Sequence, residues 1–130
     1  MSRYTGSLPS QSAAGGTSTT LVGTVETTDD AGTNLTGVTL TPPAGFSTVT
    51  GVVTNNVTFN VRQLRAGAAL GTVASVTLAS GTNLVAETPL TVPVTAPLAI
   101  QAGDVFDVQM VQNASGLAVG AGVLCQVDVN

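Results

Sequence analysis

A strict alternation of apolar and polar residues recurs along the chain and limits what it can fold into. Val57, Phe59 and Val61 alternate with polar residues, and the pattern returns over 105–110 and 123–129. Because successive side chains of a strand point to opposite faces, this period of two places the apolar residues on one buried face. Valine and threonine, which are β-branched and favourable in strands, are the commonest residues. No segment of ten or more residues shows a helical period, so the sequence predicts an all-β fold.

About eight short strands are expected, at the spacing typical of an antiparallel β-sandwich. Clusters of Asp, Gly, Asn and Ser separate them and favour turns. Prolines in the sixth candidate indicate an edge strand or a broken strand. Residues 64–70 could form one helical turn, which Gly67 would weaken. The expected strands cover residues 21–28, 38–40, 48–54, 57–62, 73–79, 84–94, 105–110 and 123–129.

The first twenty residues differ from the rest, because they are mainly Ser, Thr, Gly, Ala and Gln. Such a stretch alone buries too little apolar surface to offset the entropy of ordering it. We therefore expect an extended N-terminal arm over residues 1–20 and a sandwich domain over residues 21–130. The alternative is a plain tail or linker. The predicted anchors of the arm on a partner protein are Arg3, Tyr4, Leu8 and Pro9.

Charge is scarce: 8% of the residues are charged, the net charge is −4, and the three cations are all arginine. Neutralising phosphates requires a cluster of Lys and Arg, so we expect no nucleic-acid partner. Histidine is absent, which excludes histidine-dependent catalysis. No apolar run approaches 18 residues and the first residues do not resemble a signal peptide, so no membrane partner is expected. A surface this poor in charge favours an obligate oligomer or a component of an assembly.

Two of the three cations, Arg62 and Arg65, lie within four residues of each other. A guanidinium group is shaped for bidentate pairing with a carboxylate, and such a pair can connect two subunits. We therefore predict that Arg62 and Arg65 belong to a subunit interface. The equally weighted alternative is a surface ion pair, worth about 0–1 kcal/mol.

The sequence lacks the motifs of the common catalytic classes. A serine triad lacks its histidine, and a phosphate-binding loop of the Walker type lacks its lysine. Cys125, the single cysteine, lies in an alternating strand with no histidine to activate it, and we expect it to be a small buried apolar residue. We therefore expect no enzymatic activity and no cofactor.

Two groups of carboxylates are candidate sites. Asp104 and Asp107 are three residues apart, so an unbulged strand points them to opposite faces and they cannot form an acid–base pair. We expect a turn carboxylate and a solvent-facing strand residue. Asp29, Asp30 and Asn34 offer oxygen ligands for Ca²⁺, but their spacing is not that of an EF-hand. A plain turn without metal is expected there.

Three segments resemble small virion proteins of tailed phages, namely jelly-roll decoration (cement) proteins and head-fibre-like proteins of the outer capsid. The resemblance covers about half of the chain, from residue 55 to residue 111, and rests on pattern rather than on a functional motif. Its segments are Asn55–Arg62, Ala79–Ala86 and Ile100–Phe106, the last being a polar-Ala-Gly-Asp turn that leads into an apolar strand.

The resemblance implies a jelly roll that forms a homotrimer, or less often a monomer or dimer. It also implies that the protein binds the major capsid protein on the outer surface of the head, after assembly in the host cytoplasm. It carries over no catalytic residues. The expected function is a non-enzymatic structural virion protein. The alternatives are a carbohydrate- or receptor-binding module of the lectin type, another tail or baseplate subunit, a bacterial surface or pilus subunit, and an enzyme.

Overall fold

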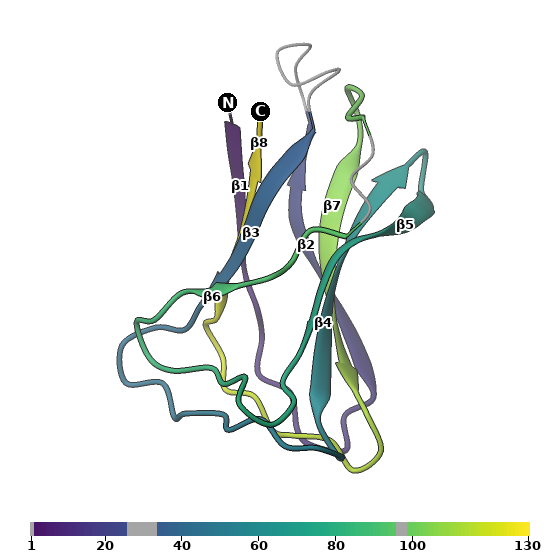
Figure 1. The fold of residues 1–130 in the computed structure, drawn as a ribbon. Coiled ribbons are helices and arrows are strands. Elements are labelled where there is room, and N and C mark those ends of the chain that lie inside the picture. The colour runs from purple at the N-terminus through teal and green to yellow at the C-terminus, as the bar shows by residue number, and fades with distance from the viewer. Residues whose placement is uncertain (1, 26–33, 96–98) are drawn as a thin grey trace.

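The chain folds into two four-stranded antiparallel sheets packed face to face (Figure 1). The structure is a computed structural model that describes residues 2–25, 34–95 and 99–130. It confirms the predicted all-β sandwich with about eight strands. The strands are β1 (Ser2–Ser7), β2 (Thr17–Thr24), β3 (Leu35–Thr41), β4 (Val57–Arg65), β5 (Ala68–Thr77), β6 (Leu90–Thr91), β7 (Val105–Gln112) and β8 (Leu124–Val129).

The strand pairing is nested. One sheet has the order β1-β8-β3-β6 and the other the order β2-β7-β4-β5. The first strand therefore pairs with the last, β2 with β7, β3 with β6 and β4 with β5. A single long antiparallel hairpin, wrapped so that successive pairs fall in alternate sheets, produces this arrangement. Every connection except the β4–β5 hairpin crosses between the sheets.

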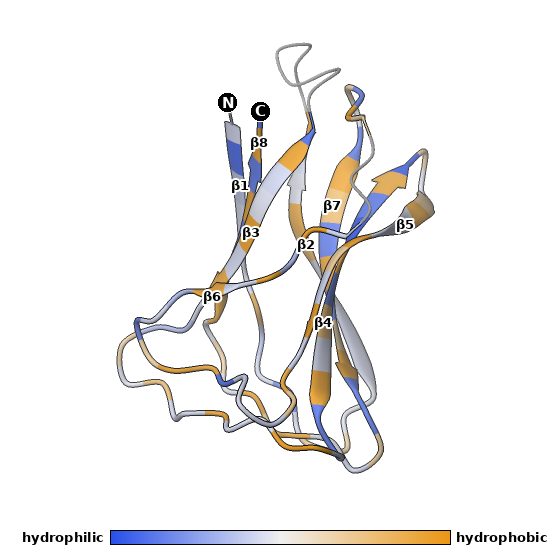
Figure 2. Ribbon diagram, viewed as in Figure 1, coloured by the Kyte–Doolittle hydropathy of each residue, from blue (hydrophilic) through white to orange (hydrophobic). Residues whose placement is uncertain are grey.

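The core lies between the sheets and is built by the alternation seen in the sequence. Val57, Phe59 and Val61 of β4 are fully buried, and Phe106, Val108 and Met110 of β7 lie beside them. From the other sheet, β8 contributes Cys125, Val127 and Val129. Figure 2 shows the orange and paler bands alternating along β4 and β7. The sequence predicts these three strands because their inward faces are apolar, apart from Gln63 near the end of β4.

The N-terminal residues form part of the sandwich, which corrects the predicted arm over residues 1–20. β1 pairs with β8 along its whole length, from Ser2 opposite Val129 to Ser7 opposite Leu124. The predicted boundary at residue 20 falls inside β2. The physical reason is that backbone hydrogen bonds to β8 order the segment, so it does not need a row of large apolar side chains.

β1 and β2 are edge strands of different sheets, and glycines let them approach each other closely. A Cβ on Gly6 would lie 2.7 Å from the carbonyl oxygen of Leu21, and a Cβ on Gly23 would lie 2.8 Å from Cδ1 of Tyr4. The Tyr4 ring then tilts against Phe106, with 5.7 Å between the ring centroids. These contacts close one side of the sandwich.

The opposite side is closed by the segment that follows β6. Val92 donates its backbone N–H to Val38 of one sheet, while Pro93 accepts from Ser75 and Thr95 donates to Val73 of the other. The segment therefore covers the middle of the β5 edge. Proline fits here because, at the edge of a sheet, not every backbone N–H has to donate a hydrogen bond to a neighbouring strand.

Candidate interaction surface

All three arginines form ion pairs with aspartates of the same chain. Arg62 of β4 lies directly opposite Asp107 of β7. Its Nε donates to Oδ1 at 2.9 Å and its Nη2 to Oδ2 at 2.7 Å, so the pair is bidentate. The hydrogen bond to Asp107 raises the pKa of the Arg62 guanidinium further above its ordinary value. The pair thus connects the two central strands of its sheet.

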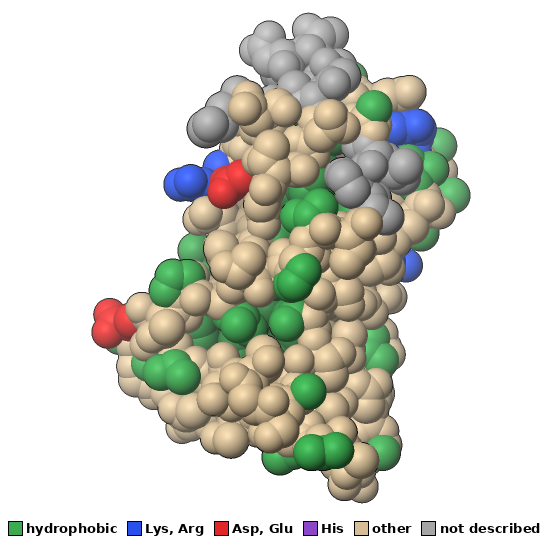
Figure 3. Space-filling model, viewed as in Figure 1, with side chains coloured by type: hydrophobic (Ala, Val, Ile, Leu, Met, Phe, Trp, Pro, Cys, Tyr) green, Lys and Arg blue, Asp and Glu red, His purple; other side chains and the backbone are tan. Residues whose placement is uncertain are grey.

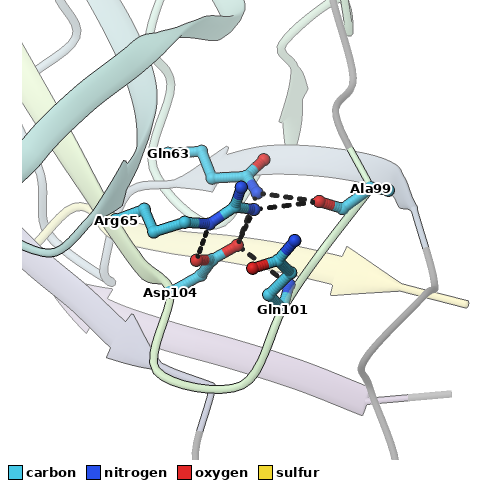
Figure 4. A network of polar contacts seen from close by, with 5 residues as sticks. All are labelled: Gln63, Arg65, Ala99, Gln101 and Asp104. Atoms are coloured by element: carbon cyan, nitrogen blue, oxygen red, sulfur yellow. Dashed lines mark hydrogen bonds and ion pairs between the residues drawn. The ribbon is translucent and has the colours of Figure 1, made fainter.

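Arg65 reaches a more deeply buried carboxylate, Asp104, which has no exposed surface. Its Nε donates to Oδ1 at 2.8 Å and its Nη2 to Oδ2 at 2.9 Å (Figure 4). The side-chain amide of Gln63 and the backbone N–H of Gln101 also donate to Oδ2. The hydrogen bonds, that from Arg65 foremost, lower the pKa of Asp104 to about 2 although burial opposes the shift.

This network fixes the turn that precedes β7. Arg65 Nη2 and Gln63 Nε2 both point to the carbonyl oxygen of Ala99, at 3.3 Å and 3.5 Å. Figure 4 shows the five groups converging on the turn between Ala99 and Asp104. The buried carboxylate therefore has a structural role: it organises the backbone through which the chain enters the core strand.

The structure pairs Arg62 and Arg65 with aspartates of the same chain, as the ion-pair alternative supposed, although both carboxylates are buried. Asp104 ends the turn before β7, as expected, whereas Asp107 is buried against Arg62 and does not face solvent, which corrects that part of the expectation. A signal for both pairs was present in the sequence. Arg62 and Arg65 are three residues apart, and so are Asp104 and Asp107. When β4 and β7 run antiparallel in the observed register, each arginine therefore lies near one of these aspartates. An interface role for the exposed parts of the two arginines stays a prediction.

The predicted anchors of the arm lie on or against the chain's own sandwich. Tyr4 packs on Phe106, and Leu8 is buried with its backbone N–H donated to Val123. Arg3 lies on the outer face of its sheet, where Nε donates to Asp128 at 2.8 Å. Pro9 is exposed. Tyr4 and Leu8 thus anchor the segment within the molecule, and a contact of this segment with a partner stays a prediction.

The remaining candidate groups are buried or lie outside the described residues. Cys125 is buried, as predicted, and burial raises the pKa of its thiol to about 12. Asp29 and Asp30 fall outside the described residues. Elsewhere in the described chain, no three His, Cys, Asp or Glu side chains gather as metal ligands, and no pocket is found. Over residues 2–25, 34–95 and 99–130 there is no helix that could cross a membrane.

Comparison of the chain with protein-family models, with curated proteins and with solved structures gives no match. The fold therefore rests on the strand pairing described above, and the resemblance to phage virion proteins stays a prediction.

Proposed function

We propose that the chain is a non-enzymatic structural virion protein that decorates the outside of an assembled phage head and stabilises it. The observation that carries this proposal is the nested pairing of β1 with β8, β2 with β7, β3 with β6 and β4 with β5. This pairing supports a jelly roll of eight strands, an architecture common in viral capsid domains.

Within the described residues, most side chains that could carry chemistry are committed to the fold, Glu87 being an exception. Asp104, Asp107 and Asp128 each hold an arginine, and Cys125 lies in the core with a raised thiol pKa. The sequence supplies neither histidine nor lysine. This distribution favours a role in binding over one in catalysis.

The mechanism of stabilisation follows from mass action. A protein that binds the assembled shell but not its dissociated subunits lowers the free energy of the shell by its free energy of binding. If three copies associate, as the resemblance implies, each trimer binds through several contacts at once. Once one subunit of the trimer is bound, the other two are held at a high effective concentration near their sites. Binding is then stronger although each site makes no new contact.

The test uses heads of the virus that encodes the chain, prepared with this gene disrupted. Purified protein is mixed with the heads, and bound copies are counted after sedimentation. We expect saturable binding, an increase in the temperature at which the heads disrupt, and no binding to dissociated major capsid protein. Absence of protein from the sedimented heads, or equal binding to dissociated subunits, contradicts the proposal.

One observation favours a second candidate, a lectin-like module. Thr19, Gln109, Asn60 and Ser75 form a row across the outer face of the β2-β7-β4-β5 sheet. Ser75 donates to Asn60 at 2.7 Å, and Gln109 donates to Thr19 at 3.4 Å. Uncharged amides and hydroxyls of this kind hydrogen-bond sugars readily. Glycan-array binding that is lost in Asn60→Ala would favour this candidate, and silence of the wild-type protein would eliminate it.

A further inference from the structure

Four long loops meet at one end of the sandwich. The end of β1 lies opposite the start of β8, the start of β2 opposite the end of β7, and the start of β4 opposite the ends of both β5 and β7. The connections around these strand ends therefore gather at one tip, at the bottom of Figure 1. We call this tip the loop end; it comprises residues 8–16, 42–56, 78–89 and 113–123.

Charge is distributed unevenly between the loop end and the rest of the molecule. The four loops contain one charged residue, Glu87. The ion pairs of Arg3, Arg62 and Arg65 lie on the strands or at the opposite end. Figure 3 shows red at the left edge of the face, at the level of these loops, and only green and tan below it. A scarcity of charge of this kind is typical of the centre of a protein–protein interface.

The loops are irregular but held firmly by backbone hydrogen bonds. Val49 and Leu84 exchange both of their backbone hydrogen bonds, and so do Gln11 and Val119. Three of these side chains, Val49, Leu84 and Val119, are buried and extend the core into the loop end. Asn83 also accepts the backbone N–H of Gly51 through its side chain at 2.8 Å.

Buried and half-buried amides connect the loops further. Gln112 holds the 113–117 turn through Leu117, accepting its N–H and donating to its carbonyl oxygen, both at 2.8 Å. It also donates to Gln11 at 3.0 Å, which joins the first loop to the last. Asn113 donates to Asn56 at 2.8 Å. A surface ordered in advance loses little conformational entropy on binding, so the loop end is suited to docking.

The loop end exposes apolar side chains beside its single charge. Val53 is 78% exposed and Val85 is 39% exposed. Val85 and Glu87 belong to the same turn, which is closed by the N–H of Thr88 donating to Val85. The backbone N–H of Glu87 donates to Pro42 at 2.9 Å and fixes the residue at φ 55°. An isolated carboxylate thus lies in the same turn as the exposed Val85.

We propose that the loop end is the surface that docks on a different protein, one that offers an uncharged apolar surface and a Lys or Arg opposite Glu87. This inference rests on the proposed function, in which the other protein is the major capsid protein. Charge complementarity argues against a second copy. The chain contains no lysine, and each of its three arginines is already paired with an aspartate of its own. Another copy therefore has no uncommitted arginine or lysine side chain for Glu87.

The experiment compares a charge placed on the loop end with the same charge placed at the opposite end. Val53→Asp tests the loop end, and Leu70→Asp is its control, since Leu70 is 40% exposed near the β4–β5 hairpin. Each variant is titrated onto the heads described above. We expect Val53→Asp to weaken the apparent affinity roughly tenfold or more and Leu70→Asp to change it less than about twofold. Circular dichroism confirms that both variants are folded.

Glu87→Gln isolates the charge, because it keeps the shape of the side chain. We expect a loss of affinity of roughly threefold to tenfold at low salt, and a weaker dependence of binding on salt than that of the wild-type protein. Unchanged binding by both Val53→Asp and Glu87→Gln overturns the inference and leaves the proposed function standing. Loss of binding in Leu70→Asp alone shows that the opposite end docks, which also overturns it.

Two further outcomes separate the inference from the function. Sedimentation velocity of the free protein shows whether Val53→Asp dissociates an oligomer; if it does, the loop end binds a second copy and the inference is wrong. Failure of the wild-type protein to bind heads at all overturns the proposed function, and the inference with it.

Discussion

The turn of the β4–β5 hairpin is occupied by an unfavourable residue. Ala66 and Gly67 form a two-residue turn between the paired residues Arg65 and Ala68, and both have positive φ, 53° and 79°. Such a turn is of the I′ type and favours Asn-Gly. Alanine is strained there because of its Cβ. This geometry also explains why residues 64–70 form a hairpin and not the helical turn that the sequence allowed.

Ala66→Asn should therefore stabilise the protein by about 0.5–1 kcal/mol, because asparagine tolerates the left-handed conformation better than alanine does. Urea unfolding measures the change. Ala68→Asn, at an exposed strand position beside the turn, is the matched control and should give no gain. Equal effects at both positions would mean that the backbone conformation of residue 66 is not the cause.

The buried carboxylate of Asp104 should make stability dependent on pH. Its pKa is lowered to about 2 in the folded protein, below the ordinary value near 3.8 that it has when unfolded. The stabilisation is therefore complete above about pH 4 and is lost as the pH falls toward 2, and it amounts to about 2 kcal/mol. Asp104→Asn should lose this contribution at neutral pH, and its stability should approach that of the wild-type protein near pH 2.

Urea unfolding between pH 2 and pH 7 measures this difference. Asp128→Asn removes the exposed ion pair with Arg3 and should cost no more than about 1 kcal/mol. If the difference in unfolding free energy between the wild-type protein and Asp104→Asn is constant across this pH range, the carboxylate acts through packing alone.

At the scale of the element, the close approach of β1 to β2 should depend on Gly6. A Cβ there would lie 2.7 Å from the backbone oxygen of Leu21 and 3.1 Å from Cα of Val22, and neither atom can move without its strand. Gly6→Ala should therefore destabilise the protein by about 1–3 kcal/mol. Gly37→Ala in β3 is the matched control, since an added Cβ meets nothing within 4 Å. Thermal unfolding distinguishes the two, and a similar cost for both would contradict the tight contact.

The strands that could be predicted from the sequence are those with a uniformly apolar inward face. β4, β7 and β8 have such faces, apart from Gln63 near the end of β4, and they form the centre of the core. β1 was missed because its inward positions are Ser2, Tyr4 and Gly6, so its stability comes from pairing with β8 and from a glycine contact. Neither backbone pairing nor a glycine contact requires an alternation of apolar and polar residues in the sequence.

The candidate surface was harder to predict than the core. Charge scarcity indicated a protein-binding surface, but it did not show where the remaining charges lie. The distribution of the charges depends on which strand ends lie at the same end of the sandwich, and the nested strand pairing decides this. The partners of Arg62 and Arg65 were missed for the same reason, because their aspartates become neighbours only once β4 and β7 pair.

At the scale of the whole molecule, the nested pairing makes the first and last strands neighbours, so the two ends of the chain should unfold together with the core. Cys125 reports on this, because it lies in β8 between β1 and β3 and is completely buried. Burial raises the pKa of its thiol to about 12, so alkylation at neutral pH requires opening of the sandwich. The free energy of opening obtained from the labelling rate should equal the free energy of global unfolding from circular dichroism. Val53→Cys in a Cys125→Ala background is the exposed control and should react at the rate of a free thiol. Rapid labelling of Cys125 well below the urea transition would mean that β1 detaches by itself, and β1 would then be a mobile arm after all.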